Sequence, residues 1–414
     1  MPLKTIYNYD FSKMSNADIS ASNFCNKFFS KTLTLPELKI IHDYVQQNNI
    51  TIAGQTIPAA IHLKGTSGDN IQPFVILAQL HGNEPAGLAG IALALALSQA
   101  GLLKRDVIGI IGNPLAARQY FAALEKLPNT LQETRDAFRC GLSEKGELLP
   151  DGNRIPIDFM TRNDDTAHIK RSRELYLLGQ NISGILDIHS ARGNMTCITD
   201  HKNDRDLKYS PIRALLTELA EAISANSSAA ITVQTLKTIL SPLPNIICQI
   251  GIEAGRHEDP NAPHVAAAST LATIYNQGIT DVKPLQPEDD SVFIRYSVQP
   301  RITYNDLIRE GELQSGDKIY MARENMFDNN GVIENYQYDE MEAIKAGQIV
   351  AIARPSGVVF RAASNFSGIF FSKSGALYDK DPSVGPWPVD AAKIDSVKFC
   401  YPCIVSEMKM DWMS

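Results

Sequence analysis

The chain has 414 residues, more than one average domain needs, and its hydrophobic fraction of 44% is enough for a large core. We therefore expect two domains. The formal charge of −7 argues against general nucleic-acid binding, which favours a basic surface, and fits a small-molecule substrate better.

The first residues, 1–10, lack the continuous apolar core of a secretory signal and contain aromatic and charged side chains that do not suit one. The longest Ala-rich apolar run, 91–97, is far shorter than the roughly 18 residues of a membrane span. We expect a cytoplasmic protein with neither a membrane nor a nucleic-acid partner. Assembly into a homo-oligomer is left open.

The N-terminal segment, residues 1 to about 50, is expected to be mainly helical. Thr34 can cap a helix that carries Pro36 in its first turn, and apolar residues then recur at helical spacing up to Val45. The segment carries no recognisable chemistry.

From Ile61 onward the pattern changes to strand, turn and helix. Helical stretches such as 86–100 and 167–180 separate apolar runs at 74–80, 107–111 and 185–188. This alternation predicts an α/β domain with a mostly parallel mixed sheet flanked by helices.

A polar region, 125–165, interrupts this pattern and is rich in proline and glycine. Long irregular insertions in compact domains are often functional. The basic run that follows, Lys170, Arg171 and Arg173, is expected to form a solvated helix face.

Beyond about Asp281 the composition indicates a linker and then a strand-rich tail, with short strands at 291–298, 347–353 and 357–362. We predict a boundary after residue 284. The α/β domain then spans 1–284, including the helical segment 1–50, and a smaller all-β accessory domain spans 285–414.

Residues that can bind a metal stand at the ends of three predicted strands. His81 and Glu84 follow the run 74–80, His189 follows 185–188, and Glu253 follows 246–252. In an open α/β sheet, reactive side chains gather at the carboxyl ends of the strands. Two histidines and one carboxylate are a ligand set of catalytic zinc, with the fourth position open to water or substrate. Glu253 is then the candidate base.

Four blocks of sequence together resemble the succinylglutamate desuccinylase/aspartoacylase family, zinc amidohydrolases with the fold of zinc carboxypeptidases. The blocks are His81-Gly82-Asn83-Glu84, Gly112-Asn113-Pro114-Leu115-Ala116, Asp187-Ile188-His189-Ser190-Ala191-Arg192-Gly193 and Ile252-Glu253-Ala254-Gly255. The resemblance implies that His81, Glu84 and His189 bind one Zn²⁺ per chain and that Glu253 is the general acid/base. The β-rich tail is similar to the family's accessory domain.

The family also has an arginine that stabilises the transition state, followed by an Asp-Leu-Asn-Arg motif whose Asn-Arg pair holds a substrate carboxylate. The stretch 154–163 resembles this pattern, which implies the first role for Arg154 and the second for Arg162, although Thr161 stands where the family has Asn. Arg118 competes with Arg154, but its spacing matches less well. Arg192 follows a ligand-bearing strand and is a further candidate for substrate binding.

The implied reaction is zinc-dependent hydrolysis of the amide of a small N-acyl amino acid. Glu253 would take a proton from water activated at the metal, and Arg154 would meet the developing oxyanion. Two alternatives stay open: a zinc carboxypeptidase acting on peptides, and a non-catalytic metal-binding member of the fold. An accessory domain over the pocket favours the small substrate, and a retained base disfavours a non-catalytic role.

Overall fold

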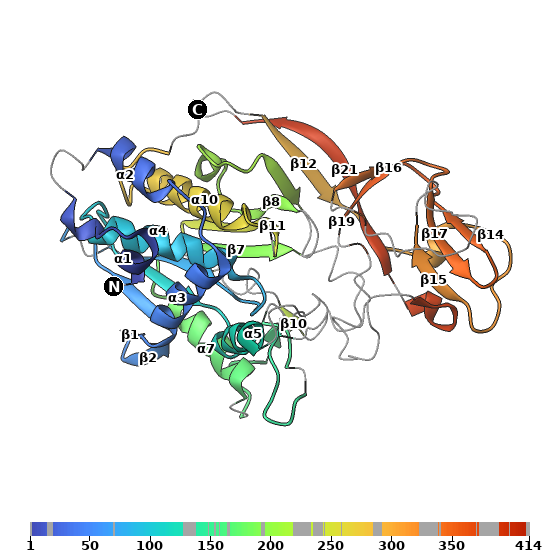
Figure 1. Ribbon diagram of the computed structural model, residues 1–414, viewed down its shortest axis with the longest axis horizontal. Coiled ribbons are helices and arrows are strands. Elements are labelled where there is room, and N and C mark those ends of the chain that lie inside the picture. The colour runs from blue at the N-terminus through green and yellow to red at the C-terminus, as the bar shows by residue number, and fades with distance from the viewer. Residues whose placement is uncertain are drawn as a thin grey trace.

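The computed structural model describes residues 2–14, 20–68, 71–126, 138–147, 149–152, 155–156, 158–163, 166–191, 195–217, 233–234, 243, 245–257, 259–284, 292–322, 338, 341–369, 371, 389–396 and 398–410. A large mixed sheet forms the centre of the molecule (Figure 1). Its middle consists of parallel strands in the order β5-β4-β7-β11: Val107–Ile111, Phe74–Ala78, Gly184–Ala191 and Cys248–Arg256. These strands confirm the predicted fold class.

Antiparallel neighbours flank this parallel centre. Strand β3 (Ala60–Leu63) pairs with β5, and β8 (Thr196–His201) pairs with β11. The sheet then continues through β9 (Ala214–Thr217), which runs parallel to β8. Two short strands, β6 (Ile155–Pro156) and β10 (Val233–Gln234), pair separately.

The central strands are buried on both faces, because alternate side chains enter two different cores. Phe74, Ile76 and Ala78 of β4 pack with helices α4 (Leu88–Gln99) and α10 (Ala262–Asn276). Val75 and Leu77 pack on the opposite face with helix α7 (Ala167–Gly179). The continuous apolar runs of the sequence therefore reflect a sheet covered on both sides (Figure 1).

The N-terminal segment packs into the first of these cores. Its elements are α1 (Pro2–Tyr7), η1 (Phe11–Lys13), α2 (Ala21–Phe28) and α3 (Leu35–Gln46). The hairpin β1 (Asn49–Ile52) and β2 (Gln55–Pro58) follows, and its Ile50 and Ile57 pack in the second core. Helix α3 begins after Thr34 as predicted, and Thr34 donates its backbone N–H to Glu37 at 2.8 Å in a capping box.

The C-terminal region builds a second, antiparallel sheet in the order β14-β18-β17-β15-β20: Ile308–Glu310, Val359–Arg361, Ile349–Arg354, Lys318–Met321 and Val389–Asp390. This sheet has its own apolar core. The remaining C-terminal elements are β13 (Ile302–Thr303), β16 (Glu342–Ile344), β19 (Phe366–Ile369), η5 (Tyr304–Asp306) and η8 (Ala391–Ser396).

The large sheet extends past residue 284. Strand β12 (Val292–Val298) lies parallel to β9 and pairs with the long strand β21 (Lys398–Lys409), which leads toward the second sheet (Figure 1). Hydrogen bonds of one sheet thus join strands from both sides of residue 284, and the domain boundary there stays a prediction.

The basic run on α7 differs from expectation. Arg171 is buried, donates hydrogen bonds to the carbonyls of Gly112 at 3.0 Å and Pro58 at 3.2 Å, and pairs with Glu174 at 2.7 Å. The predicted solvated face is wrong for this residue, which ties α7 to the ends of β5 and β2.

Across the described ranges, no helix is both long enough and apolar enough to cross a membrane.

Candidate metal centre

The first two candidate ligands stand on a tight turn after β4. The chain turns at Gln79, whose φ of 52° is positive. Gly82 lies so close to its surroundings that a Cβ there would be 2.4 Å from the carbonyl carbon of Ala116 and 2.6 Å from the carbonyl oxygen of Phe138. Its N–H donates to the carbonyl of Arg139 at 2.8 Å. Only glycine allows this approach, which fixes the turn between His81 and Glu84.

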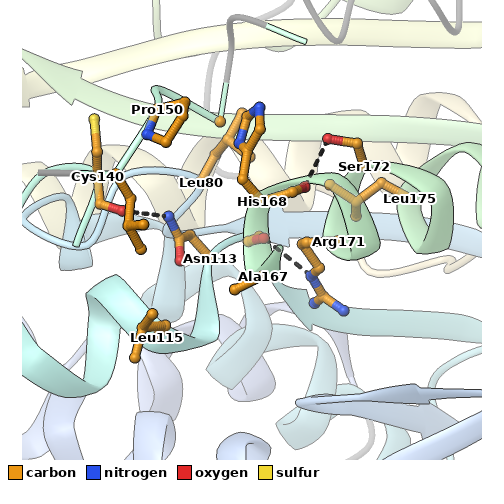
Figure 2. A pocket seen from close by; sticks show the side chains of 13 residues that line it. Leu80, Asn113, Leu115, Cys140, Pro150, Ala167, His168, Arg171, Ser172 and Leu175 are labelled. Carbon is orange, nitrogen blue, oxygen red and sulfur yellow. Dashed lines mark hydrogen bonds between the residues drawn. The ribbon is translucent and has the colours of Figure 1, made fainter. Parts of the chain in front are cut away.

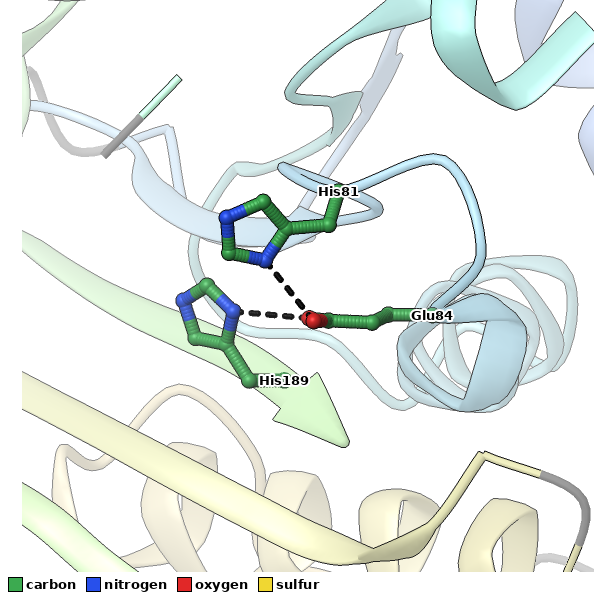
Figure 3. A group of neighbouring side chains, drawn as sticks. All are labelled: His81, Glu84 and His189. Atoms are coloured by element: carbon green, nitrogen blue, oxygen red, sulfur yellow. Dashed lines mark hydrogen bonds and ion pairs between the residues drawn. The ribbon is translucent and has the colours of Figure 1, made fainter. Parts of the chain in front are cut away.

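The three candidate ligands converge. His81 Nδ1 lies 2.7 Å from one carboxylate oxygen of Glu84, and His189 Nδ1 lies 2.8 Å from the other (Figure 3). One ligand atom from each residue lies within 4.8 Å of the other two, and all three side chains are buried. Two imidazoles and one carboxylate, with no fourth protein ligand among the described residues of this cluster, form a donor set that fits zinc with an open position.

A carboxylate stands behind each histidine ring. Asp187 lies two residues before His189 on β7 and therefore on the same face of the strand, and its Oδ2 is 3.1 Å from His189 Nε2. Asp151 Oδ1 is 2.9 Å from His81 Nε2. A carboxylate that accepts from Nε2–H leaves the Nδ1 lone pair for a metal and orients the ring. Both rings thus present Nδ1 inward.

The carboxylates and histidines of the cluster shift one another's pKa values toward the charged forms. Burial alone would raise the pKa of Glu84, but His81 and His189 outweigh it and hold this pKa well below its ordinary value. Burial alone would lower the pKa of His189, but Asp187 and Glu84 raise it well above the ordinary value. Positive charge is therefore favoured between these carboxylates, and a divalent cation in place of the protons satisfies the same electrostatic demand.

Sequence reasoning missed an arginine at the cluster. Arg139 Nη1 lies 3.1 Å from Glu84 Oε1, and its Nη2 lies 2.9 Å from His81 Nε2 and 3.6 Å from Asp151 Oδ2. His81 Nε2 cannot both donate to Asp151 and accept from Arg139. With a metal bound at Nδ1, His81 would carry its proton on Nε2, so that Nε2 would donate to Asp151 and Arg139 would face the two carboxylates.

The Gly-Asn-Pro block positions the loop that carries Arg139. Asn113 Oδ1 accepts from the N–H of Ala116 at 3.1 Å, in the first turn of α5 (Pro114–Lys126). Its Nδ2 donates to the carbonyl of Cys140 at 3.1 Å, and its backbone N–H donates to the carbonyl of Gln79 at 2.9 Å. One side chain therefore joins the ligand turn, a helix start and the Arg139 loop.

Comparison with known proteins bears on the fold. No family model matches the sequence, and no curated protein matches it. Among solved structures, the product-bound ectoine utilization protein EutE (DoeB) from Ruegeria pomeroyi superposes with a TM-score of 0.50 at 14% identity, over 85% of this chain and 89% of that one. A succinylglutamate desuccinylase/aspartoacylase from Rhodobacter sphaeroides superposes with a TM-score of 0.50 at 12% identity, over 86% and 90%.

The chain has the fold of the succinylglutamate desuccinylase/aspartoacylase family. At such low identity the likeness concerns the fold alone, and it confirms the resemblance at that level.

The other residues predicted for the site differ in where they lie relative to the cluster. Glu253 on β11 stands directly beside His189 in the parallel register of β11 and β7, and it is half-buried. Arg162 lies in an exposed turn, with Nη1 4.0 Å from Asp158. Arg118 is exposed on α5. Arg154 and Arg192 lie outside the described residues, so their roles stay predictions.

Asp151 begins a second stretch that resembles the family's Asp-Leu-Asn-Arg motif. Asp151-Gly152-Asn153-Arg154 has the pattern Asp-x-Asn-Arg and begins three residues before the stretch 154–163. In this alignment the motif retains its Asn, and Arg139 is the arginine that precedes it. The order Arg, then Asp-x-Asn-Arg, was the sequence signal that could have found both residues.

A small pocket lies beside the cluster, between α7 and the turn after β5 (Figure 2). Leu80, Cys140 and Gly152 line it, and these are the chain neighbours of His81, Arg139 and Asp151. The rest of its lining is Gly112, Asn113, Leu115, Leu149, Pro150, Ala167, His168, Arg171, Ser172 and Leu175. Helix α7 thus supports the segment that brings Asp151 to His81.

Proposed function

We propose that the protein is a zinc-dependent hydrolase that cleaves the amide bond of a small N-acyl amino acid. One observation carries the proposal: two buried histidines direct Nδ1 at opposite oxygens of Glu84, and each has a carboxylate against its Nε2. A structural zinc site usually has four protein ligands, whereas three ligands leave a position at which chemistry can occur.

The residues divide the work of amide hydrolysis. His81, Glu84 and His189 would hold one Zn²⁺ per chain, which when bound supplies Lewis acidity toward a carbonyl oxygen and makes water more acidic. Glu253, on the strand beside His189, accepts the proton of the attacking water and returns one to the leaving nitrogen. Asp151 and Asp187 hold the two imidazole rings in the Nε2–H tautomer.

Arg139 is the best-placed arginine for the oxyanion. Its guanidinium touches the ligand cluster, while its side chain keeps 20% of its surface exposed and so can be reached by a substrate. We therefore move the oxyanion role, assigned to Arg154 from sequence, to Arg139. Arg154, as the last residue of the Asp-x-Asn-Arg pattern, is then the candidate to bind the substrate carboxylate bidentately.

The test combines metal analysis with a substrate screen. The purified protein is expected to contain zinc in a 1:1 ratio and to hydrolyse at least one compound in a panel of acetyl-, succinyl- and formyl-amino acids. Glu253→Gln should keep the zinc and lose roughly two to four orders of magnitude in kcat. Undiminished activity in this variant would exclude Glu253 as the base.

Two other outcomes distinguish the alternatives. Release of C-terminal residues from peptides, with the acyl-amino acids uncleaved, would identify a carboxypeptidase. Stoichiometric zinc with no hydrolysis of either class of substrate would identify a non-catalytic metal-binding protein.

A further inference from the structure

We propose that His42 and Gln79 form a buried brace that positions the metal-binding turn, so that the N-terminal helical segment contributes to metal affinity. The inference rests on the proposed metal centre. His42 lies on α3 in the N-terminal segment, far from the candidate ligands in sequence.

Gln79 bridges two groups at the base of the turn. Its Nε2 donates to the carbonyl of Gly82 at 3.0 Å, and its Oε1 lies 3.2 Å from Nδ1 of His42 on α3. Gln79 is fully buried and His42 nearly so. Since the Gly82 carbonyl can only accept, the amide nitrogen must face it, and Oε1 therefore faces His42. His42 Nδ1 must then carry the proton.

The brace acts on Gly82, one of the two residues that separate the candidate ligands of the turn. Gly82 stands between His81 and Glu84 in the chain, and its N–H is fixed by the carbonyl of Arg139. With the Gln79 amide on its carbonyl, both peptide groups flanking Gly82 are held. The turn therefore cannot rotate without breaking one of these bonds.

The contacts of Gln79 hold its backbone in an uncommon conformation. A φ of 52° lies in the left-handed region, which non-glycine residues seldom adopt and which persists when surrounding contacts over-determine it. Three contacts do so here, from His42, Gly82 and the N–H of Asn113. The ring of His42 also packs against Phe121 of α5, with ring centroids 4.8 Å apart, a contact that involves neither hydrogen bond of the brace.

The experiment compares four variants by zinc competition against a chromophoric chelator and by the d–d absorption of the Co²⁺-substituted protein. His42→Leu removes the donor and leaves Gln79 Oε1 buried without it. Gln79→Asn tolerates a positive φ but is too short to span both partners. Both should weaken zinc binding by about 10- to 100-fold and shift the Co²⁺ spectrum, as losses of groups that orient ligands do.

Two further variants separate positioning from general stability. His42→Asn places an amide N–H near the position of Nδ1 and should restore zinc affinity to within about threefold of wild type. Phe121→Leu alters packing on the same ring without touching the hydrogen bonds and should leave the Co²⁺ spectrum unchanged. Wild-type affinity and spectrum in either His42→Leu or Gln79→Asn would overturn the brace, and so would a loss in Phe121→Leu as large as the loss in His42→Leu. If the wild-type protein itself binds no zinc, the proposed function fails instead.

Discussion

Gly82→Ala is the sharpest test of the ligand turn, because the structure fixes the size of the perturbation. A Cβ at this position would stand 2.4 Å from a backbone carbon of Ala116, whereas real Cβ contacts essentially never fall under 3.0 Å. The obstructing atoms belong to the backbone of α5 and of the Phe138 loop, so no side chain can rotate away. The turn must therefore move by about 0.6 Å or more relative to both.

Such a shift separates the two candidate ligands of the turn, His81 and Glu84, from His189 and from Arg139. A displacement approaching 1 Å at a catalytic group can cost about 100-fold in rate. We expect kcat/KM to fall by about that factor and zinc affinity to fall by roughly 10- to 100-fold.

The assay measures zinc affinity, kcat/KM and thermal stability side by side. Gly68→Ala is the matched control, since a Cβ at Gly68 meets nothing within 4 Å and φ there is not positive. We expect it to behave as wild type. If Gly82→Ala kept both wild-type zinc affinity and wild-type kcat/KM, the close approach of the turn to α5 would not matter for the site, and the reasoning would be wrong.

Three further predictions follow from the same geometry. Arg139→Gln should retain zinc and lose about two to three orders of magnitude in kcat, and loss of zinc in place of rate would show that Arg139 serves the metal site only. Arg154→Lys should raise KM more than Arg162→Lys does, and the reverse order would restore Arg162 as the carboxylate clamp. Burial lowers the pKa of His42, so the unfolded chain binds its proton more readily and stability should decline as pH falls below about 6.5. Urea unfolding at several pH values should show a shallower decline for His42→Asn, and identical slopes would contradict this account.

Much of the fold could be predicted because its local signals agree with one another. The apolar runs of β4 and β5 have strand length, and Thr34 with Glu37 marks the start of α3. Parallel strands that are buried on both faces allow few strand orders. In each of them His81, His189 and Glu253 lie at the carboxyl ends of the strands. The convergence of the candidate ligands followed from topology more than from any single motif.

The surroundings of the ligands could not be predicted in the same way. Arg171 lies in a basic run that has the composition of a solvated helix face, yet its guanidinium is buried among backbone carbonyls. Carbonyl acceptors are available on every segment, so sequence does not indicate where a long polar side chain will find them. Arg139 was missed for a similar reason, since its partners are brought to it by a loop of irregular structure.

The difference between ligands and supporting residues has a physical basis. A metal restricts its ligands to a few side-chain types, and topology restricts where they can stand, so ligands leave a readable pattern. A hydrogen bond that orients a ligand can come from any element that reaches it, as Asp187 does from the same strand and Asp151 from a distant loop. A supporting residue need not contact a ligand at all, since His42 is connected to the turn through the hydrogen bonds of Gln79. Supporting residues of this kind can be identified only from the three-dimensional structure.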